Sequence, residues 1–244
     1  KIPKITLSQQ QILLVEANSS IHIISNDEYF ACLSRSNASA ATSFNIKEYY
    51  PRLYQSMHYA KDLIEKGAAI NSVRQHRYDF NPLLEAANNG DVAMVKLLLD
   101  KGANIETRYN TGETALYFSI SSNKKNEQHF IETTKLLISR GADVNALCGD
   151  STPLIAASGG NHLEVAKILL ENGANIHQGT KSVYPPIWQA VLSNNSEMLQ
   201  LLINYGADVN TKNIKGWTPL FYLRVHGHRQ SDIVNLLIKN GAHL

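Results

Sequence analysis

The stretch RGADVNALCGDSTPLIAASGGNHLEVAKILLENGANIH, residues 140–177, contains one short phrase twice: GADVN begins at Gly141 and GANIH begins at Gly173. The Gly-Ala pair that opens the phrase also begins at positions 67, 102, 206 and 241. Successive copies are 32 to 39 residues apart. A regular period near 33 residues is typical of proteins that stack copies of one small structural unit.

Each unit is predicted to begin with a short helix that starts at a proline. Thr152-Pro153 and Thr218-Pro219 stand upstream of apolar stretches, and related pairs occur at 81–82, 114–115 and 185–186. Proline is tolerated in the first helical turn because the N–H that it lacks would have no partner within the helix. A threonine directly before it can accept a hydrogen bond from the first turn, so Thr152 and Thr218 are predicted N-caps.

Each unit is predicted to end with a longer amphipathic helix that stops at the repeated glycine. Aliphatic pairs such as Leu201-Leu202 lie just before that glycine. Glycine adopts a positive φ at little cost and therefore ends helices well. The turn between the two helices carries Gly90, Asn161 or Asn194, the residue types that best tolerate a left-handed backbone. One such pair cannot bury its apolar faces alone, so we expect neighbouring units to stack.

These triplets and glycine phrases resemble the ankyrin repeat family, whose signature reads T-P-L-H-x-A, over about residues 45 to 244. The resemblance implies an all-α solenoid of about five full helix-turn-helix repeats, a degenerate N-terminal repeat and short hairpin tips. The histidine of the signature is absent throughout. Its apolar replacements, which predict packing rather than polar contacts, are Leu84, Tyr117, Ile155, Trp188 and Phe221.

Residues 44–244 are predicted to form the repeat domain, whereas residues 1–43 do not fit the repeat. We interpret this N-terminal segment as a helical cap, because a stack needs an atypical covering at its end. The alternative is the remnant of another domain. Two repeats are longer than the rest, and their extra residues are predicted loops: the polar tract from Ser121 to Gln128, and the residues around His226 to His228.

The composition favours a folded, soluble monomer in the cytoplasm. An apolar fraction of 43% is ordinary for globular proteins, and a net charge of +2 is too small to indicate nucleic-acid binding or an anionic membrane. No apolar run is long enough for membrane insertion, and two cysteines make no disulfide framework. The richness in Asn, Ile, Ser and Lys, together with the similarity to degenerate ankyrin arrays of intracellular bacteria, extends this hypothesis to an effector secreted into host cytosol.

The sequence predicts no catalysis, no cofactor and no metal site within residues 1–244. It contains no phosphate-binding glycine loop, no H-E-x-x-H, no C-x-x-C and no G-x-S-x-G motif. Cys32 is interpreted as a packed small hydrophobe, and Cys148 is expected to be exposed at a hairpin tip. His226 and His228 are too few to close a zinc site.

The positions at which the repeats disagree are the candidates for partner binding. The row expected to line the inner groove varies in a way that no packing rule produces, and the hairpin tips are expected to form a basic ridge with aromatic anchors. The ankyrin resemblance implies that these two sets bind a partner protein. The predicted binding residues are Tyr184, Trp217, Tyr222, Arg108, Tyr109, Phe118, Gln189, Lys181, Lys215 and Glu85.

Within this set, Tyr184, Trp217 and Tyr222 form the predicted hot spot, because tyrosine, tryptophan and arginine tend to dominate binding energy. Arg108 and Tyr109 form a second predicted patch. The alternative for each aromatic side chain is that it packs on a neighbouring hairpin. For Trp188, whose row is otherwise apolar, packing is the preferred interpretation.

The leading functional hypothesis is a non-catalytic module for protein–protein interaction, with an acidic partner surface favoured. The alternative is the substrate-targeting part of a larger multidomain enzyme whose catalytic domain lies outside this chain. Asn145 and Asn210 end D-V-N hairpins similar to those that an asparaginyl hydroxylase modifies in ankyrin proteins. The resemblance therefore implies that both are hydroxylation sites.

Overall fold

The computed structural model describes residues 70–71, 81–121, 127–179, 184–227 and 231–244. These residues form helices joined by turns and hairpins, and no strand occurs among them, in agreement with the predicted all-α class. The helical cap proposed for residues 1–43 and most of the degenerate first repeat lie outside the described residues.

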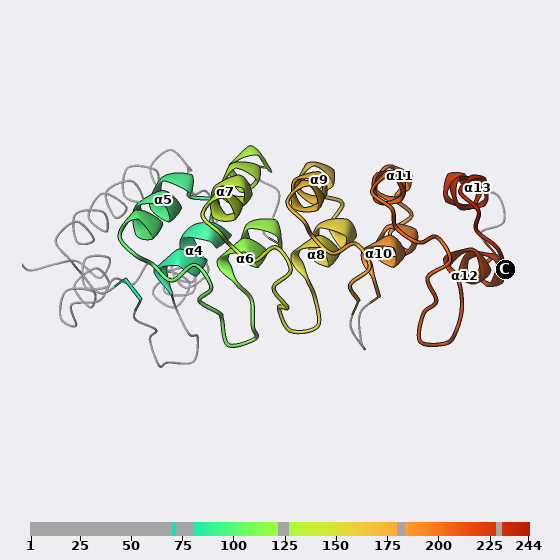
Figure 1. Cartoon of the computed structure of the whole chain (residues 1–244), viewed down its shortest axis with the longest axis horizontal. Coiled ribbons are helices and arrows are strands. Elements are labelled where there is room, and N and C mark those ends of the chain that lie inside the picture. The colour runs from blue at the N-terminus through green and yellow to red at the C-terminus, as the bar shows by residue number, and fades with distance from the viewer. Residues whose placement is uncertain (1–69, 72–80, 122–126, 180–183, 228–230) are drawn as a thin grey trace, which may run out of the picture.

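The described helices form five consecutive pairs, arranged in two layers along an elongated molecule (Figure 1). The pairs are α4 (Pro82–Asn88) with α5 (Val92–Asp100), α6 (Ala115–Ser121) with α7 (Glu127–Ser139), α8 (Pro153–Gly159) with α9 (Leu163–Glu171), α10 (Pro186–Leu192) with α11 (Ser196–Asn204), and α12 (Pro219–Val225) with α13 (Asp232–Lys239). The first helix of each pair belongs to the inner layer and the second to the outer layer. The hairpins between pairs project beyond the inner layer.

The predicted starts of the five described inner helices are confirmed, and four of them begin at a proline. Pro82, Pro153, Pro186 and Pro219 each stand in the first turn. The hydroxyls of Thr152 and Thr218 accept hydrogen bonds from the amides of Ile155 and Phe221, each at 3.2 Å. These two caps satisfy amides that the helix itself leaves without a partner.

The left-handed positions are also confirmed. Gly90, Asn161 and Asn194, in the turns between paired helices, have φ of 66°, 61° and 53°. The glycines that end the outer helices have φ of 85° to 92°. A methyl group added at Gly141 or Gly206 would meet nothing within 4 Å. The backbone angle alone, and not crowding, therefore favours glycine at these two positions.

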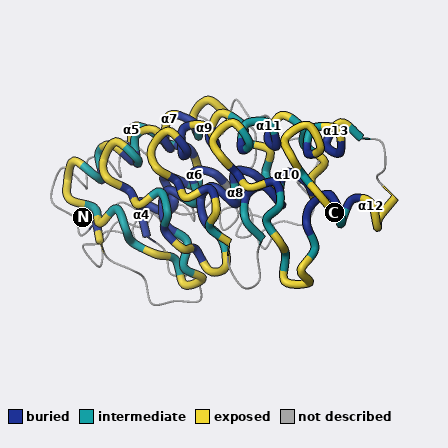
Figure 2. Tube along the Cα trace, turned by 45° about the vertical axis from the view of Figure 1, so that its right-hand side comes forward, coloured by how far each residue is buried: buried dark blue, intermediate teal, exposed yellow. Residues whose placement is uncertain are grey.

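The core runs as a continuous stripe between the two layers (Figure 2). Each outer helix contributes at least one leucine that is 0% exposed, and each inner helix contributes an aliphatic residue that is at most 2% exposed. The outer-layer leucines include Leu98, Leu137, Leu169, Leu202 and Leu237. Because every repeat buries its apolar residues against its neighbours, stability is shared along the stack.

The predicted loop from Ser121 to Gln128 is wrong at both ends. Ser121 belongs to α6, whereas Glu127 and Gln128 belong to α7, which has 13 residues where α5 has 9. The side-chain amide of Gln128 donates to Glu132 one turn later, at 2.9 Å. Part of the insertion therefore lengthens an outer helix, because such pairs four residues apart support helical structure.

Asp91, the N-cap of α5, provides a pH-dependent test of this packing. Its carboxylate accepts a hydrogen bond from the amide of Met94 at 3.0 Å. Burial raises the pKa of Asp91 above its ordinary value of 3.8, outweighing the hydrogen bonds from Met94 and Ala93 and the charge of His129. The unfolded chain then releases this proton at lower pH than the folded chain does. The ionised form of Asp91 therefore costs stability, and this cost appears as the pH rises through the two pKa values.

Replacing Asp91 with asparagine is expected to raise the melting temperature near neutral pH, because asparagine keeps the capping oxygen without the buried charge. The gain should shrink as the pH falls and vanish below 3.8, where aspartate is protonated in both states. Thermal unfolding across this range measures it. Asp91→Ala, which removes the cap, should lose about 0.5–2 kcal/mol. An Asp91→Asn protein that melts below wild type at neutral pH would contradict the argument.

Candidate partner-binding surface

Aromatic rings from the last two repeats lie in one chain of contacts, which we name the ring cluster. Its members are Tyr184, Trp188, Trp217, Phe221, Tyr222 and His226. Ring centroids are 5.2 Å apart for Tyr184 and Trp188, and 5.7 Å apart for Trp188 and Tyr222. The three residues of the predicted hot spot are thus brought together, although Tyr184 and Tyr222 meet only through Trp188.

Trp188 is the support of the cluster. It is 0% exposed, and its indole N–H donates to the backbone oxygen of Thr211 in the next hairpin at 2.9 Å. The prediction that Trp188 packs is confirmed. Leu84 and Ile155 in the same row are also buried, whereas Tyr117 and Phe221 are half-buried.

The other members of the cluster remain accessible to solvent. Tyr184, Trp217 and Tyr222 are half-buried, and His226 is exposed. The Tyr222 and His226 rings lie 4.2 Å apart, and the Lys215 ammonium lies 5.2 Å from the centre of the Trp217 ring. Rings that are packed on one side and open on the other lose little conformational freedom on binding, which favours them as anchors.

The second predicted patch is assembled around α6. The rings of Tyr109 and Phe118 meet edge to face, with centroids 5.8 Å apart. The exposed Arg108 guanidinium donates to the backbone oxygens of Gly112, in its own hairpin, and Leu147, in the next. Arg108 therefore joins two hairpin tips as well as presenting a positive charge.

Three other residues of the predicted set differ in their accessibility. Glu85 is only 9% exposed, and its carboxylate accepts a hydrogen bond from the Asn89 amide at 2.9 Å. Gln189 is half-buried, and its side-chain amide donates to the backbone oxygen of Tyr184 at 3.4 Å. Lys181 lies outside the described residues. Of these three, Gln189 is the one that the structure places on the inner face beside the ring cluster.

The expectation that Cys148 is exposed at a hairpin tip is wrong, because the residue is 4% exposed. Its sulfur lies 3.9 Å from the Thr114 hydroxyl and 3.6 Å from the Ala146 oxygen. Cys148 forms an isolated antiparallel bridge with Ser151 across the hairpin, and its thiol faces Thr114 at the end of the preceding hairpin. Burial raises the pKa of the Cys148 thiol, which disfavours the reactive thiolate.

Asn145 and Asn210, the predicted hydroxylation sites, link successive repeats. The side-chain amide of Asn145 donates to the backbone oxygen of Gly173 at 3.1 Å, and its oxygen accepts from the backbone amide of Asn175 at 2.7 Å. Asn210 makes the equivalent pair with Gly241 and His243, at 3.1 and 3.0 Å. Asn71, two repeats before Asn145, does the same with Gly102 and Asn104. Sequence reasoning missed this ladder, although asparagine recurring at the fifth position of the repeated phrase could have indicated it.

Among the hairpins that the structure describes in full, only the last is basic. The hairpins at 102–114 and 141–152 contain Glu106, Glu113, Asp143 and Asp150 against a single cation, Arg108. The expected basic ridge is therefore wrong for these two hairpins. In the last repeat, Lys212, Lys215 and Arg224 are all exposed, and no acidic residue occurs between Asp208 and Asp232.

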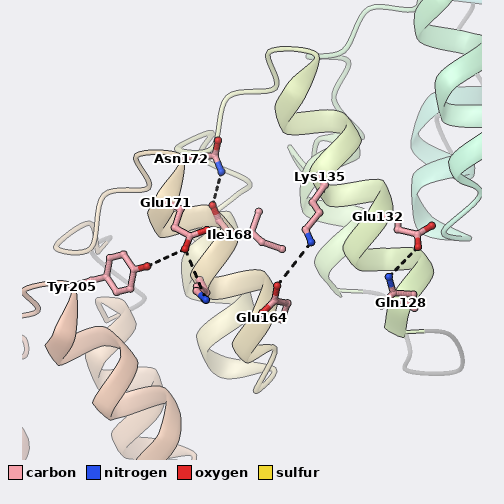
Figure 3. A network of polar contacts seen from close by, with 9 residues as sticks. Gln128, Glu132, Lys135, Glu164, Ile168, Glu171, Asn172 and Tyr205 are labelled. Atoms are coloured by element: carbon pink, nitrogen blue, oxygen red, sulfur yellow. Dashed lines mark hydrogen bonds and ion pairs between the residues drawn. The ribbon is translucent and has the colours of Figure 1, made fainter.

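The outer layer presents a different kind of surface. Figure 3 shows the polar contacts that join its helices, among them Lys135 with Glu164 at 3.9 Å and Tyr205 with Glu171 at 3.4 Å. A hollow of about 560 Å³ lies between α9, α11 and α13, lined in part by Gln200, Leu201 and Leu236. Its lining also contains Ser196, Glu197 and Asp232, and no cysteine or histidine.

The described residues form neither a cluster of metal ligands nor a membrane-spanning helix. Among the described residues, no three histidine, cysteine, aspartate or glutamate side chains gather closely enough to hold a metal ion. Within the same residues, no helix has both the length and the apolar character needed to cross a bilayer.

Comparison with known proteins gives matches along the repeats. A family model described as "Ankyrin repeats (3 copies)" matches residues 54–148 and 179–244, and another described as "Ankyrin repeats (many copies)" matches residues 137–184. The chain is 31% identical over 115 residues to the ankyrin repeat, SAM and basic leucine zipper domain-containing protein 1 of Dasypus novemcinctus, which is 47% of this chain and 23% of that protein.

A second relative is a putative ankyrin repeat protein of Acanthamoeba polyphaga mimivirus. It is 30% identical over 167 residues, which is 67% of this chain and 21% of the viral protein. The matched part of the chain therefore spans less than a quarter of the length of either relative.

Proposed function

The chain belongs to the ankyrin repeat family, and we propose that it is a non-catalytic module that binds a partner protein through the inner helices and hairpin tips of its last two repeats. Ankyrin repeats form protein–protein interaction modules, and this coarser role follows from the family. The finer placement rests on the ring cluster, in which half-buried Tyr184 and Tyr222 flank a fully buried Trp188. Half-buried Trp217 joins them through His226, which contacts Tyr222.

The ring cluster supports this placement because it combines rigidity with accessibility. Trp188 anchors the rings on a packed core and ties α10 to the next hairpin through the Thr211 oxygen. The exposed apolar side chains of Leu192, 44% exposed, and Val225, 54% exposed, extend the surface along α10 and α12. A partner that covers these groups removes apolar surface from water without first having to order the residues that it contacts.

Simultaneous replacement of Tyr184, Trp217 and Tyr222 by alanine is expected to lower partner recovery at least tenfold, because each hot-spot truncation costs about 1 kcal/mol or more. Affinity capture with quantitative mass spectrometry compares the variant with wild type. A matched control replaces Lys135, Glu164 and Lys167 on the outer layer, which should leave recovery unchanged. Equal recovery by wild type and the aromatic variant, with both proteins folded by circular dichroism, would overturn the placement.

A second candidate role is favoured by the length of the relatives, of which this chain matches less than a quarter. In this role the repeats target a larger multidomain enzyme to its substrate. The full reading frame decides between the two roles, since a catalytic domain encoded in the same frame supports targeting. The hypothesis of a bacterial effector in host cytosol stays a prediction, because the relatives reported come from an animal and a giant virus.

A further inference from the structure

The hairpins of the described repeats are charged unequally along the stack. Residues 102–114 carry two acidic side chains and one basic one, and residues 141–152 carry two acidic side chains and no lysine or arginine. We name these two hairpins the acidic half. Lys212, Lys215 and Arg224, in the last repeat, form the basic end. In the described part of the chain, none of these three cations is in an ion pair.

The surface between the two ends carries no charged residue on the described inner helices α8 and α10. On the inner helices it presents Ala156 and Gly159 of α8, Gln189 and Leu192 of α10, and Tyr222 of α12. Gly159 is exposed, and a side chain built there would touch the Gln189 amide oxygen of α10 at 3.5 Å. An apolar or aromatic side chain of a partner could lie over α8 between Phe118 and the ring cluster without meeting a charge.

From this arrangement we infer that the partner presents an extended protein segment of asymmetric charge. Its acidic end lies over Lys212, Lys215 and Arg224, its middle places an aromatic or aliphatic side chain on the inner helices, and its basic end faces Asp143 and Asp150. The inference rests on the proposed function and adds the chemistry and direction of the bound segment. Complementary charges at an interface set orientation and select against the reversed arrangement.

The dimensions are consistent with a short segment. Neighbouring helices pack about 8–10 Å apart, so the hairpins after α7 and α11 are separated by roughly 20 Å along the stack. An extended chain advances about 3.3 Å per residue, so roughly six residues span the two charged ends. With flanking residues over Arg224 and the acidic hairpin at 102–114, a segment of about ten to twelve residues covers the whole surface.

The probe for this inference is a phage-displayed library of random peptides of about twelve residues, selected on the whole immobilised chain. We expect the enriched peptides to share an aromatic or large aliphatic residue, with Asp or Glu on one side of it and Lys or Arg on the other. Reversing Lys212, Lys215 and Arg224 to glutamate should weaken a purified enriched peptide about tenfold at low salt, and less at high salt. Reversing Lys135, Lys167 and Lys96 on the outer layer is the matched control and should have no effect.

A peptide synthesised in the reverse order tests direction, and it should bind more weakly than its parent. Suppose that the enriched peptides need Tyr222 but show no charge asymmetry, and that they bind the protein with glutamate at positions 212, 215 and 224 as well as they bind wild type. That result would overturn this inference and leave the proposed function standing. Enrichment that is indifferent to Tyr184, Trp217 and Tyr222, or no enrichment, would overturn both.

Discussion

Trp188→Ala is expected to lower the free energy of unfolding by about 3–5 kcal/mol, the range for removing a fully buried aromatic side chain. Trp188 is 0% exposed and lies between the rings of Tyr184 and Tyr222. The change also leaves the Thr211 oxygen without its indole donor. Urea denaturation monitored by circular dichroism measures the loss.

The loss should be local, because stability in a stack is a sum over repeats and their interfaces. Native-state hydrogen exchange should therefore show faster exchange in α10 and α12, while α4 and α6 keep their protection. Trp188→Phe is the matched control, because it keeps most of the buried ring and removes the hydrogen bond. An alanine variant that unfolds like wild type would show that Trp188 does not support the ring cluster.

The internal repetition predicted much of the fold because its signals are local. A threonine before Pro153 specifies a helix start, and a glycine after Leu201-Leu202 and their neighbours specifies a helix end, without knowledge of the rest of the molecule. The insertion before α7 was harder to predict. Its polar residues match a loop in composition, yet Glu127 and Gln128 extend the helix because Gln128 pairs with Glu132 one turn away.

The candidate site was less predictable because its contacts join residues from different repeats. The sequence places Tyr184 and Tyr222 in one predicted hot spot, but the ring that connects them belongs to Trp188, which is predicted to pack. Glu85 and Cys148 were misjudged in accessibility for the same reason. Hairpin and helix positions alone do not show which side chain turns toward a neighbouring repeat, as the Cys148 thiol turns toward Thr114.

Asn145→Ala is expected to cost about 1–3 kcal/mol, because it removes two hydrogen bonds between successive repeats and leaves both backbone partners to solvent. The Asn145 side chain bridges the Gly173 oxygen and the Asn175 amide. Only an amide side chain offers a donor and an acceptor in this geometry. Asn145→Asp should recover part of the loss, since aspartate can still accept from Asn175. A denaturation midpoint unchanged by Asn145→Ala would refute the structural role of the ladder.

Two hairpins have another residue at the position of the bridging asparagine, and the ladder predicts the effect of restoring asparagine at one of them. At the equivalent position of the preceding hairpin, Glu106 accepts from the Asp143 amide at 2.9 Å but has no proton to donate to Gly141. His177 occupies the equivalent position of the hairpin that follows Asn145. Its side chain makes no hydrogen bond to Gly206 or Asp208 in the described structure. His177→Asn should therefore complete the bridge and raise stability by about 1 kcal/mol, as seen in the urea midpoint. If Asn145→Ala lowers the urea midpoint but His177→Asn leaves it unchanged, the backbone spacing at the His177 hairpin, and not the missing amide side chain, prevents the bridge.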